Sequence, residues 1–296
     1  MRVLKNILPV LLCWIIQLLP IRGFTQCFSC AVAPPGTIWC DDFEDSIPLR
    51  EKYFEYNDNK GLFIRMPGVG RNGTAGMRVQ FQQGADEAGS LKKSFGRIPG
   101  SYFNKHVTNP TQDYQEIYWR MDIRMQPGWT GSPFKLSRAI SFVDSTWAEG
   151  MMAHIWNGGK TNLLVMDPAS GIDTAGKILA TRYNDFPHLR WLGNKGGNIE
   201  VYDQASSGQW FCVEAHVKLN TPGKKDGLFE FWVNDTLQAG SYNLNWHGNY
   251  NNRQDAYMIN AVFFENYWND GAPKTQERYF DNLVISTQRI GCACGK

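Results

Sequence analysis

The chain has 296 residues, 43% of them hydrophobic and 14% aromatic, and a formal net charge of +2. This composition can fill a sizeable core and excludes a largely disordered chain, and the absence of a basic tract excludes a nucleic-acid partner. No stretch has the composition of a linker, and large β-sandwiches reach this length as single domains. We therefore expect one domain over residues 27–296.

Residues 1–26 have the features of a secretory signal peptide. A basic start with Arg2 and Lys5 precedes an apolar run from Ile7 to Leu19, which is short for a membrane span. We expect a secreted or periplasmic protein that is monomeric and makes no membrane contact once the signal is removed. An uncleaved N-terminal anchor is the alternative.

Six cysteines follow the signal: Cys27, Cys30, Cys40, Cys212, Cys292 and Cys294. An even number in an exported chain favours disulfides. The first two and the last two lie at opposite ends of the sequence, so they would join the ends of the chain if its end strands pair. Cys212 is either the partner of Cys40 or a free thiol. A zinc site made of the four terminal thiolates is the alternative to disulfides.

Alternation with a period of two predicts β-strands along most of the chain. Apolar and polar residues alternate at 77–81, 117–125, 211–219 and 229–233. Turns rich in Gly, Pro and Asn separate these segments, and no long amphipathic helix is evident. We therefore predict an all-β fold, built as an antiparallel β-sandwich.

The polar faces of the predicted strands carry an unusual mixture of aromatic, basic and acidic residues: Tyr118, Arg120, Arg124, His154, Trp156, Glu214, His216 and Trp232. Aromatic rings stack on the apolar faces of pyranose sugars, and charged groups bond sugar hydroxyls and carboxylates. The mixture predicts a carbohydrate-binding surface. The alternative is that loops cover these faces, which would make the rings a second core.

Two short acidic motifs lie near the two ends of the chain. They are Asp41-Asp42-Phe43-Glu44 and Tyr279-Phe280-Asp281-Asn282. Each is typical of a β-strand with carboxylates at its edge. If the first and last strands meet, these oxygens can share a cation. A solvated strand edge is the alternative.

The ordered motifs of the chain resemble a known family. The series runs through residues 41–44, 72–79, 117–120, 208–216, 229–235, 264–267 and 279–282. It resembles the concanavalin A-like jelly rolls of the polysaccharide lyase type. It is most similar to the glucuronan lyases of polysaccharide lyase family 20 and to the related fungal cellulose-induced secreted protein. The resemblance spans about Trp39 to Thr287 and implies a concanavalin A-like jelly roll.

The resemblance also implies a structural calcium ion. Its ligands here would be the carboxylates of Glu44 and Asp281 and the backbone carbonyls of Asn72 and Ala75. Calcium takes several hard oxygen ligands, including main-chain carbonyls from turns.

The activity implied is β-elimination on a uronic-acid polysaccharide, which needs a group that neutralises the carboxylate, a base and an acid. We assign Arg120 as the neutralising group, His154 or Lys135 as the base and Tyr267 as the acid. The expected substrate-binding residues are Arg124, Trp156, Glu214, His216, Trp232 and Glu265.

Trp156 departs from the family pattern, because similar proteins carry an arginine at this place. The loss of a cation weakens the case for catalysis and leaves open whether the protein is an active enzyme. A non-catalytic, lectin-like jelly roll is therefore the first alternative. A glycoside hydrolase that uses two carboxylates, from among Glu214, Glu230 and Glu265, is the second.

Overall fold

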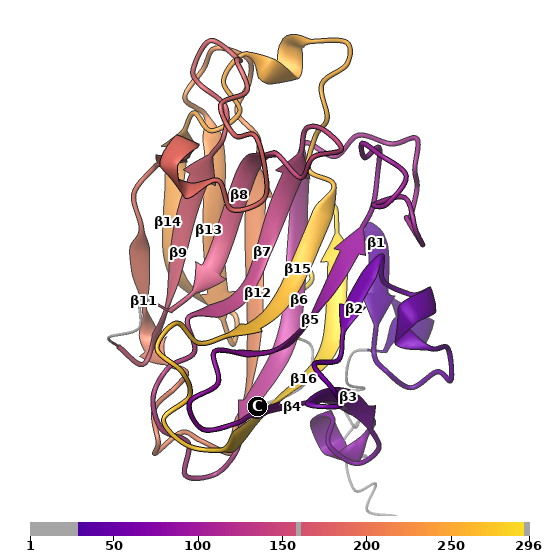
Figure 1. Ribbon diagram of the computed structural model, residues 1–296, viewed down its shortest axis with the longest axis vertical. Helices are drawn as coiled ribbons and strands as arrows, with labels where there is room; N and C mark the ends of the chain where they lie inside the picture. The colour runs from indigo at the N-terminus through magenta and orange to yellow at the C-terminus, as the bar shows by residue number, and fades with distance from the viewer. Residues whose placement is uncertain (1–28, 158–160, 293–296) are drawn as a thin grey trace, which may run out of the picture.

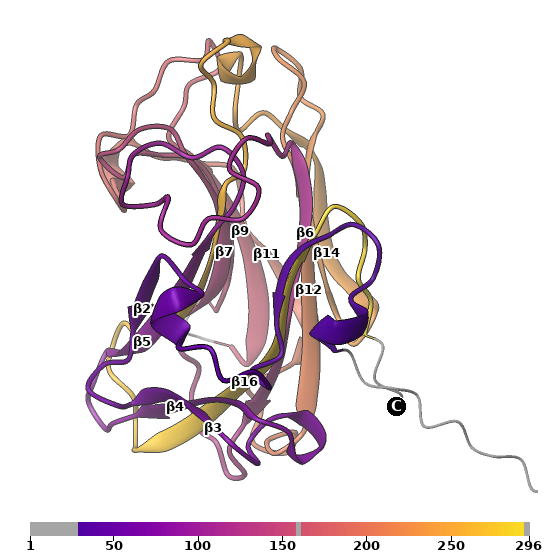
Figure 2. The same ribbon diagram turned by 90° about the vertical axis from the view of Figure 1, so that its right-hand side faces the viewer.

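A computed structural model describes residues 29–157 and 161–292. Within them the chain forms two eight-stranded sheets, whose strands pair antiparallel and which pack face to face (Figure 1, Figure 2). The described helical structure consists of short 3-10 turns: η1 (Cys30–Val32), η2 (Leu49–Glu51), η3 (Arg71–Gly73), η4 (Phe186–His188) and η5 (Tyr250–Asn252). The prediction of an all-β antiparallel sandwich is confirmed.

Sheet A is one layer of the sandwich. In spatial order its strands are β14 (Thr236–Leu244), β13 (Gly227–Val233), β12 (Trp210–Lys218), β6 (Glu116–Met125), β16 (Gln276–Ser286), β4 (Gly76–Phe81) and β3 (Phe63–Met66). The eighth strand, β1 (Thr37–Asp41), also pairs with β16. The first described strand therefore lies beside the last, as the two acidic motifs predicted.

Sheet B is the other layer. In spatial order its strands are β10 (Arg190–Trp191), β9 (Leu163–Ser170), β8 (Glu149–Trp156), β7 (Lys135–Phe142), β15 (Ala261–Tyr267), β5 (Glu87–Ser94) and β2 (Glu55–Asn57). The eighth strand, β11 (Lys195–Glu200), also pairs with β9. In Figure 2, β2, β5 and β7 of sheet B lie on the left, and β6, β12 and β14 of sheet A lie on the right.

The core fills the space between the two sheets, and the alternating strands supply it. On β6, Ile117, Trp119, Met121 and Ile123 are fully buried. The Trp119 ring lies 6.1 Å from that of Phe229 on β13. Because strand residues alternate between faces, the residues between these apolar positions point to the outer face of the same sheet.

Two disulfides are present among the described residues. They join Cys30 to Cys40 and Cys212 to Cys292. The expected link between the two ends of the chain is therefore wrong for Cys30 and Cys292, which bond Cys40 on β1 and Cys212 on β12. Cys212 is accordingly neither the partner of Cys40 nor a free thiol, as the sequence had suggested. The other two terminal cysteines, Cys27 and Cys294, and the predicted signal peptide lie outside the described residues. No described helix has the length and apolar character needed to cross a membrane.

Candidate functional site

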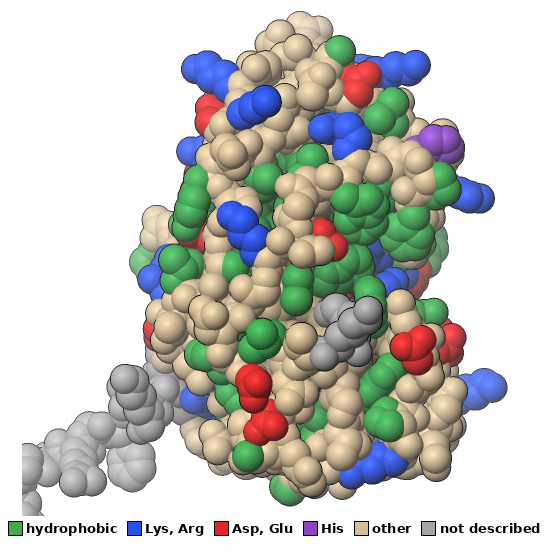
Figure 3. All heavy atoms as spheres, turned by 90° about the vertical axis from the view of Figure 1, so that its left-hand side faces the viewer, with side chains coloured by type: hydrophobic (Ala, Val, Ile, Leu, Met, Phe, Trp, Pro, Cys, Tyr) green, Lys and Arg blue, Asp and Glu red, His purple; other side chains and the backbone are tan. Residues whose placement is uncertain are grey.

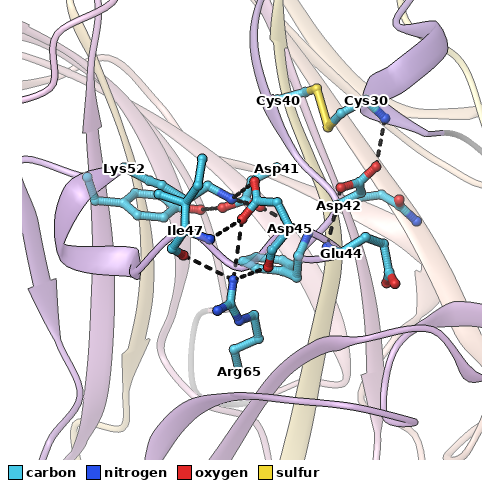
Figure 4. Close-up of polar contacts among 12 residues, drawn as sticks. Cys30, Cys40, Asp41, Asp42, Glu44, Asp45, Ile47, Lys52 and Arg65 are labelled. Atoms are coloured by element: carbon cyan, nitrogen blue, oxygen red, sulfur yellow. Dashed lines mark hydrogen bonds and ion pairs between the residues drawn. A yellow bond between two sulfur atoms is a disulfide. The ribbon is translucent and has the colours of Figure 1, made fainter.

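The acidic motif at the end of β1 is held by polar contacts of its own (Figure 4). Asp41 is buried and accepts hydrogen bonds from Lys52 Nζ at 2.5 Å and from Tyr53 Oη at 2.9 Å. Burial raises the pKa of Asp41, and the opposing effect of Lys52 does not cancel it. Asp42 accepts from the Cys30 amide at 2.8 Å. These two carboxylates therefore stabilise the first strand.

The turn of residues 70–75 brings together the four residues predicted to hold calcium: Glu44, Asn72, Ala75 and Asp281. Glu44 Oε1 accepts a hydrogen bond from the Ala75 amide at 2.7 Å, and Asp281 Oδ2 accepts one from the Arg71 amide at 2.7 Å. No three described His, Cys, Asp or Glu side chains lie close enough together to hold a metal ion. A cation at this turn would therefore need backbone oxygens as well as the two carboxylates.

The residues predicted to carry catalysis are divided between the two sheets. Lys135, His154 and Tyr267 lie on sheet B, but Arg120 lies on β6 of sheet A. Arg120 is fully buried, and its Nη2 bonds both oxygens of Asp122 at 3.0 and 3.1 Å. The assignment of Arg120 to the same groove is therefore wrong. Alternation indicates which residues face away from the core, but it does not indicate which of the two sheets carries them.

Four of the six predicted substrate-binding residues also lie on sheet A: Arg124, Glu214, His216 and Trp232. His216 contacts Glu116 and Glu230 at 2.8 and 2.9 Å, and its ring stacks on Tyr118 with centroids 3.9 Å apart. Glu214 accepts two backbone amides of the C-terminal segment, at 2.7 and 2.9 Å. These side chains are engaged by neighbouring protein groups and are not among the residues that line a pocket with Lys135.

The outer face of sheet B brings the remaining predicted residues together in rows. Tyr267 on β15 pairs with Lys135 on β7, which in turn pairs with Trp156 on β8. In a neighbouring row His154 on β8 pairs with Asp167 on β9. Because paired residues on one face lie side by side, the register itself assembles this site.

A groove with two lobes covers these rows. The aromatic lobe, of about 750 Å³, is lined by Phe134, Lys135, Trp156, Asp167, Asn184, Phe186, Trp191, Tyr267, Asn269 and Asp270. The polar lobe, of about 230 Å³, is lined by Glu87, Gly89, Ser90, Lys92, Lys135, Tyr183, Asn184, Glu265, Asn266 and Tyr267. Three residues line both lobes, and we call them the junction: Lys135, Asn184 and Tyr267.

A buried arginine forms the floor beneath the polar lobe. Arg138 Nη1 donates to Glu149 at 3.2 Å and to Asn184 Oδ1 at 2.9 Å, and Nη2 donates to Glu265 at 3.0 Å and to the Tyr183 hydroxyl. Burial favours a higher pKa for Glu265, but the adjacent Arg138 outweighs it and the pKa is lowered. Both terminal nitrogens of Arg138 are thus engaged by protein groups, so Arg138 orders the lobe and is not open to a ligand.

Lys135 and Tyr267 meet at the junction. The ammonium nitrogen lies 4.9 Å from the centroid of the Tyr267 ring, and both side chains are half-buried. Burial lowers the pKa of Lys135, although the carboxylate of Glu265 opposes the shift. The amine therefore loses its proton more easily than an exposed lysine does.

His154 lies beneath the aromatic lobe and is 2% exposed. Its Nδ1 is 2.9 Å from the Asp167 carbonyl oxygen, which can only accept, so Nδ1 carries the proton. Burial lowers the pKa of His154 to about 3. The Trp156 ring stacks on the imidazole with centroids 4.2 Å apart and planes 12° apart. His154 is therefore neutral and covered by Trp156.

Exposed aromatic rings continue outward from Trp156. The Trp191 ring lies 6.0 Å from that of Trp156 and 6.2 Å from that of Phe186, with interplanar angles of 23° and 21°. Trp191 and Phe186 are 44% and 46% exposed. Hydrophobic side chains also gather on the side of the molecule shown in Figure 3. We call Trp156, Trp191 and Phe186 the aromatic wall.

The sequence reasoning missed several groove residues: Arg138, Asp167, Tyr183, Asn184, Phe186 and Trp191. Asp167 is the one polar residue in the otherwise apolar run 163–169, and that isolation was a usable signal. Phe186 and Trp191 lie in a loop and a two-residue strand, where no alternation exists to mark them.

Three solved structures with a similar fold are polysaccharide lyases. An endo-β-1,4-glucuronan lyase from the fungus Trichoderma reesei has a TM-score of 0.55 and 12% identity, covering 85% of this chain and 96% of its own. The fold is the jelly roll of these lyases. The alginate lyase vAL-1 from Chlorella virus has a TM-score of 0.51 and 13% identity, covering 76% and 89%. The PL-14 alginate lyase from Aplysia kurodai has a TM-score of 0.50 and 14% identity, covering 85% and 99%.

The prediction of a jelly roll similar to those of polysaccharide lyases is therefore confirmed at the level of the fold. No protein-family model matches the sequence, and no curated protein matches it.

Proposed function

We propose that this protein binds a uronic-acid-containing polysaccharide in the groove of sheet B and cleaves it by β-elimination. The observation that carries the proposal is the pair of Lys135 and Tyr267 at the junction, with the amine 4.9 Å from the phenol ring. A polymer that occupies both lobes passes over this pair. The names of the three similar structures, a glucuronan lyase and two alginate lyases, support a uronate substrate.

In this proposal Lys135 is the base and Tyr267 is the acid. The neutral amine of Lys135 takes the C5 proton, and the electron pair left on C5 forms the C4–C5 double bond. The C4–O bond then breaks, and the Tyr267 hydroxyl protonates the departing glycosidic oxygen. Lys135 suits this role because burial lowers its pKa. His154 is the less suitable base, because Trp156 covers it.

The carboxylate of the substrate needs a donor in place of Arg120, which lies on the opposite sheet. Asn184 is the candidate at the junction. Its carbonyl oxygen accepts from Arg138 at 2.9 Å, so its NH2 group is the end of the amide left to donate to a ligand. A fixed donor at this point stabilises the charge that spreads onto the carboxylate when C5 loses its proton.

Ultraviolet absorbance of the unsaturated uronate product tests the proposal on glucuronan and alginate. We expect Lys135→Ala and Tyr267→Phe to lower kcat/KM by about 100-fold or more. Lys218→Ala and Tyr242→Phe are matched controls on sheet A, and both should keep the wild-type rate. Absence of product with the wild-type chain, or full activity of the first two variants, would refute the proposal.

Glycan binding without cleavage is the second candidate function. It is favoured by Trp156, where the family resemblance implies an arginine, and by the engagement of Arg138 with protein groups. Retention on a glycan column without any unsaturated product would support it. A hydrolase is less well supported. Glu265 lies on sheet B, away from Glu214 and Glu230 on sheet A, and those two are already bonded, Glu214 by two backbone amides and Glu230 by His216 and Tyr242.

We also propose that the turn of residues 70–75 holds a structural calcium ion and that the protein is secreted. The calcium proposal is supported by the carboxylates of Glu44 and Asp281, which both face this turn. Two disulfides support an oxidising compartment, since such bonds persist outside the cytosol.

A further inference from the structure

We propose that the aromatic lobe is a subsite for an uncharged sugar, so that the groove selects a polysaccharide in which a neutral residue is linked next to the uronate. The inference rests on the proposed function, because it takes the junction as the position of the uronate. The aromatic wall and Asp167 are the groups that determine which sugar the aromatic lobe accepts.

The aromatic wall has the shape of a platform for a sugar ring. Its neighbouring rings lie within 23° of parallel, and they extend from buried Trp156 to the exposed rings of Trp191 and Phe186. Trp191 and Phe186 are exposed side by side and form one apolar patch, and covering such surface is favourable by about 25 cal/mol per Å². The apolar face of a pyranose would cover these rings and leave its hydroxyl groups at the edge of the lobe.

Hydrogen bonds of the preceding residues hold the backbone that carries the exposed rings of Trp191 and Phe186. Arg190, which precedes Trp191, donates to the Ile172 carbonyl at 2.7 Å and to the Asn245 carbonyl at 3.0 Å. Asp185, which precedes Phe186, is buried and accepts from the Thr181 amide at 2.8 Å. Because these anchors fix the rings before any ligand arrives, little entropy is lost when a sugar stacks on them.

The charge of the lobe decides which sugar it accepts. Among the described residues, two carboxylates line it, half-buried Asp167 and exposed Asp270, whereas the one cation, Lys135, lies at the junction. A uronate in the aromatic lobe would place its carboxylate against that of Asp167 in a partly desolvated site, where like charges repel strongly. A neutral sugar has no such charge, and its hydroxyl groups can donate to Asp167.

The test compares two ligands with the same backbone. Glucuronan oligosaccharides are used as they are and after partial carboxyl reduction, which converts some glucuronate residues into glucose. Calorimetry on the Tyr267→Phe chain, which keeps the oligosaccharides intact, measures both affinities. We expect the partly reduced oligosaccharides to bind about tenfold more tightly, a difference of about 1.4 kcal/mol.

Variants in the same background identify the source of the preference. Trp191→Ala and Phe186→Ala should each remove most of it, and Asp167→Asn should strengthen binding of the unreduced ligand several-fold. Tyr242→Ala, which removes a still more exposed ring on sheet A, should change neither affinity. Using two wall variants keeps the test decisive if one of them folds poorly.

The outcomes separate this inference from the proposed function. Equal or tighter binding of the unreduced ligand, a preference that survives both wall variants, or no binding of either ligand would overturn the inference. Trp191-dependent binding by a wild-type chain that forms no unsaturated product would keep the subsite and refute elimination. Cleavage of unreduced glucuronan at a rate that does not depend on Trp191 would support elimination and refute the subsite.

Discussion

Among single residues, Lys135 has the environment that matters most for the proposed chemistry. Burial lowers its pKa from the ordinary value of 10.5, with Glu265 opposing this shift and Arg138 adding to it. A general base acts only when unprotonated, so the elimination rate should rise as pH increases through this lowered pKa. Initial rates measured from neutral to alkaline pH test the prediction.

Lys135→Arg is the matched variant for this prediction, because arginine keeps its proton at every accessible pH. It should be inactive over the whole range, while retaining the charge at the junction. A wild-type rate that is independent of pH, or an active Lys135→Arg variant, would contradict the role of Lys135 as base.

For single residues, alternation in the sequence predicted correctly which side chains are buried, but it predicted only some of the side chains in the candidate site. Ile117, Trp119 and Met121 were predicted to face the core, and all are fully buried. Arg120 and His154 were placed together because both lie on polar strand faces, yet a sandwich has two such faces. Only strand pairing distinguishes them, and pairing depends on contacts between residues far apart in the sequence.

At the scale of elements, the turn of residues 70–75 is packed against β16 and the loop after β1. The amide of Arg71 donates to Asp281, and that of Ala75 donates to Glu44. A calcium ion bound here would tie these three segments together and stabilise the folded state by mass action. We expect calcium to raise Tm and a chelator to lower it, as measured by thermal melting.

Asp281→Asn should abolish this calcium-dependent shift, because it removes one of the two carboxylates. Asp42→Asn is the control, since Asp42 belongs to the same acidic motif but bonds the Cys30 amide instead. The calcium proposal fails if Tm does not respond to calcium, or if both variants respond as the wild type does.

Elements with regular alternation, such as β6, β12 and β13, were predictable, and the elements that build the aromatic wall were not. Trp191 lies on β10, a two-residue strand, and Phe186 lies on the short turn η4. Their positions depend on anchors such as buried Asp185, which accepts from the Thr181 amide. A local pattern does not reveal such contacts, so this half of the site became visible only in the folded chain.

For the whole molecule, buried His247 makes stability depend on pH. Neither of its ring nitrogens has a hydrogen-bond partner among the described residues, and burial lowers its pKa from 6.5 to about 3. Below pH 6.5 the unfolded chain binds a proton that the folded chain does not, so the free energy of unfolding decreases as pH falls. Between pH 6.5 and about 5 this loss is about 1.5 kcal/mol.

His247→Leu should remove that loss, which urea unfolding at the two pH values can measure as a difference from wild type. The comparison cancels the opposite contribution of carboxyl groups whose pKa is raised by burial, such as Asp167. His106→Asn changes an exposed histidine and should keep the wild-type pH dependence. If His247→Leu and wild type lose stability in parallel, the prediction is wrong.

The order of strands also determines when the chain can fold during its synthesis. β16 lies between β6 and β4 in sheet A, and β15 lies between β7 and β5 in sheet B. Both strands follow all the other described strands in the chain, so neither sheet can be complete before they have been made. Such long-range pairing folds slowly. The sandwich is therefore completed only after synthesis has passed β16, and before β15 and β16 are made, β4, β5, β6 and β7 each lack one of their partner strands.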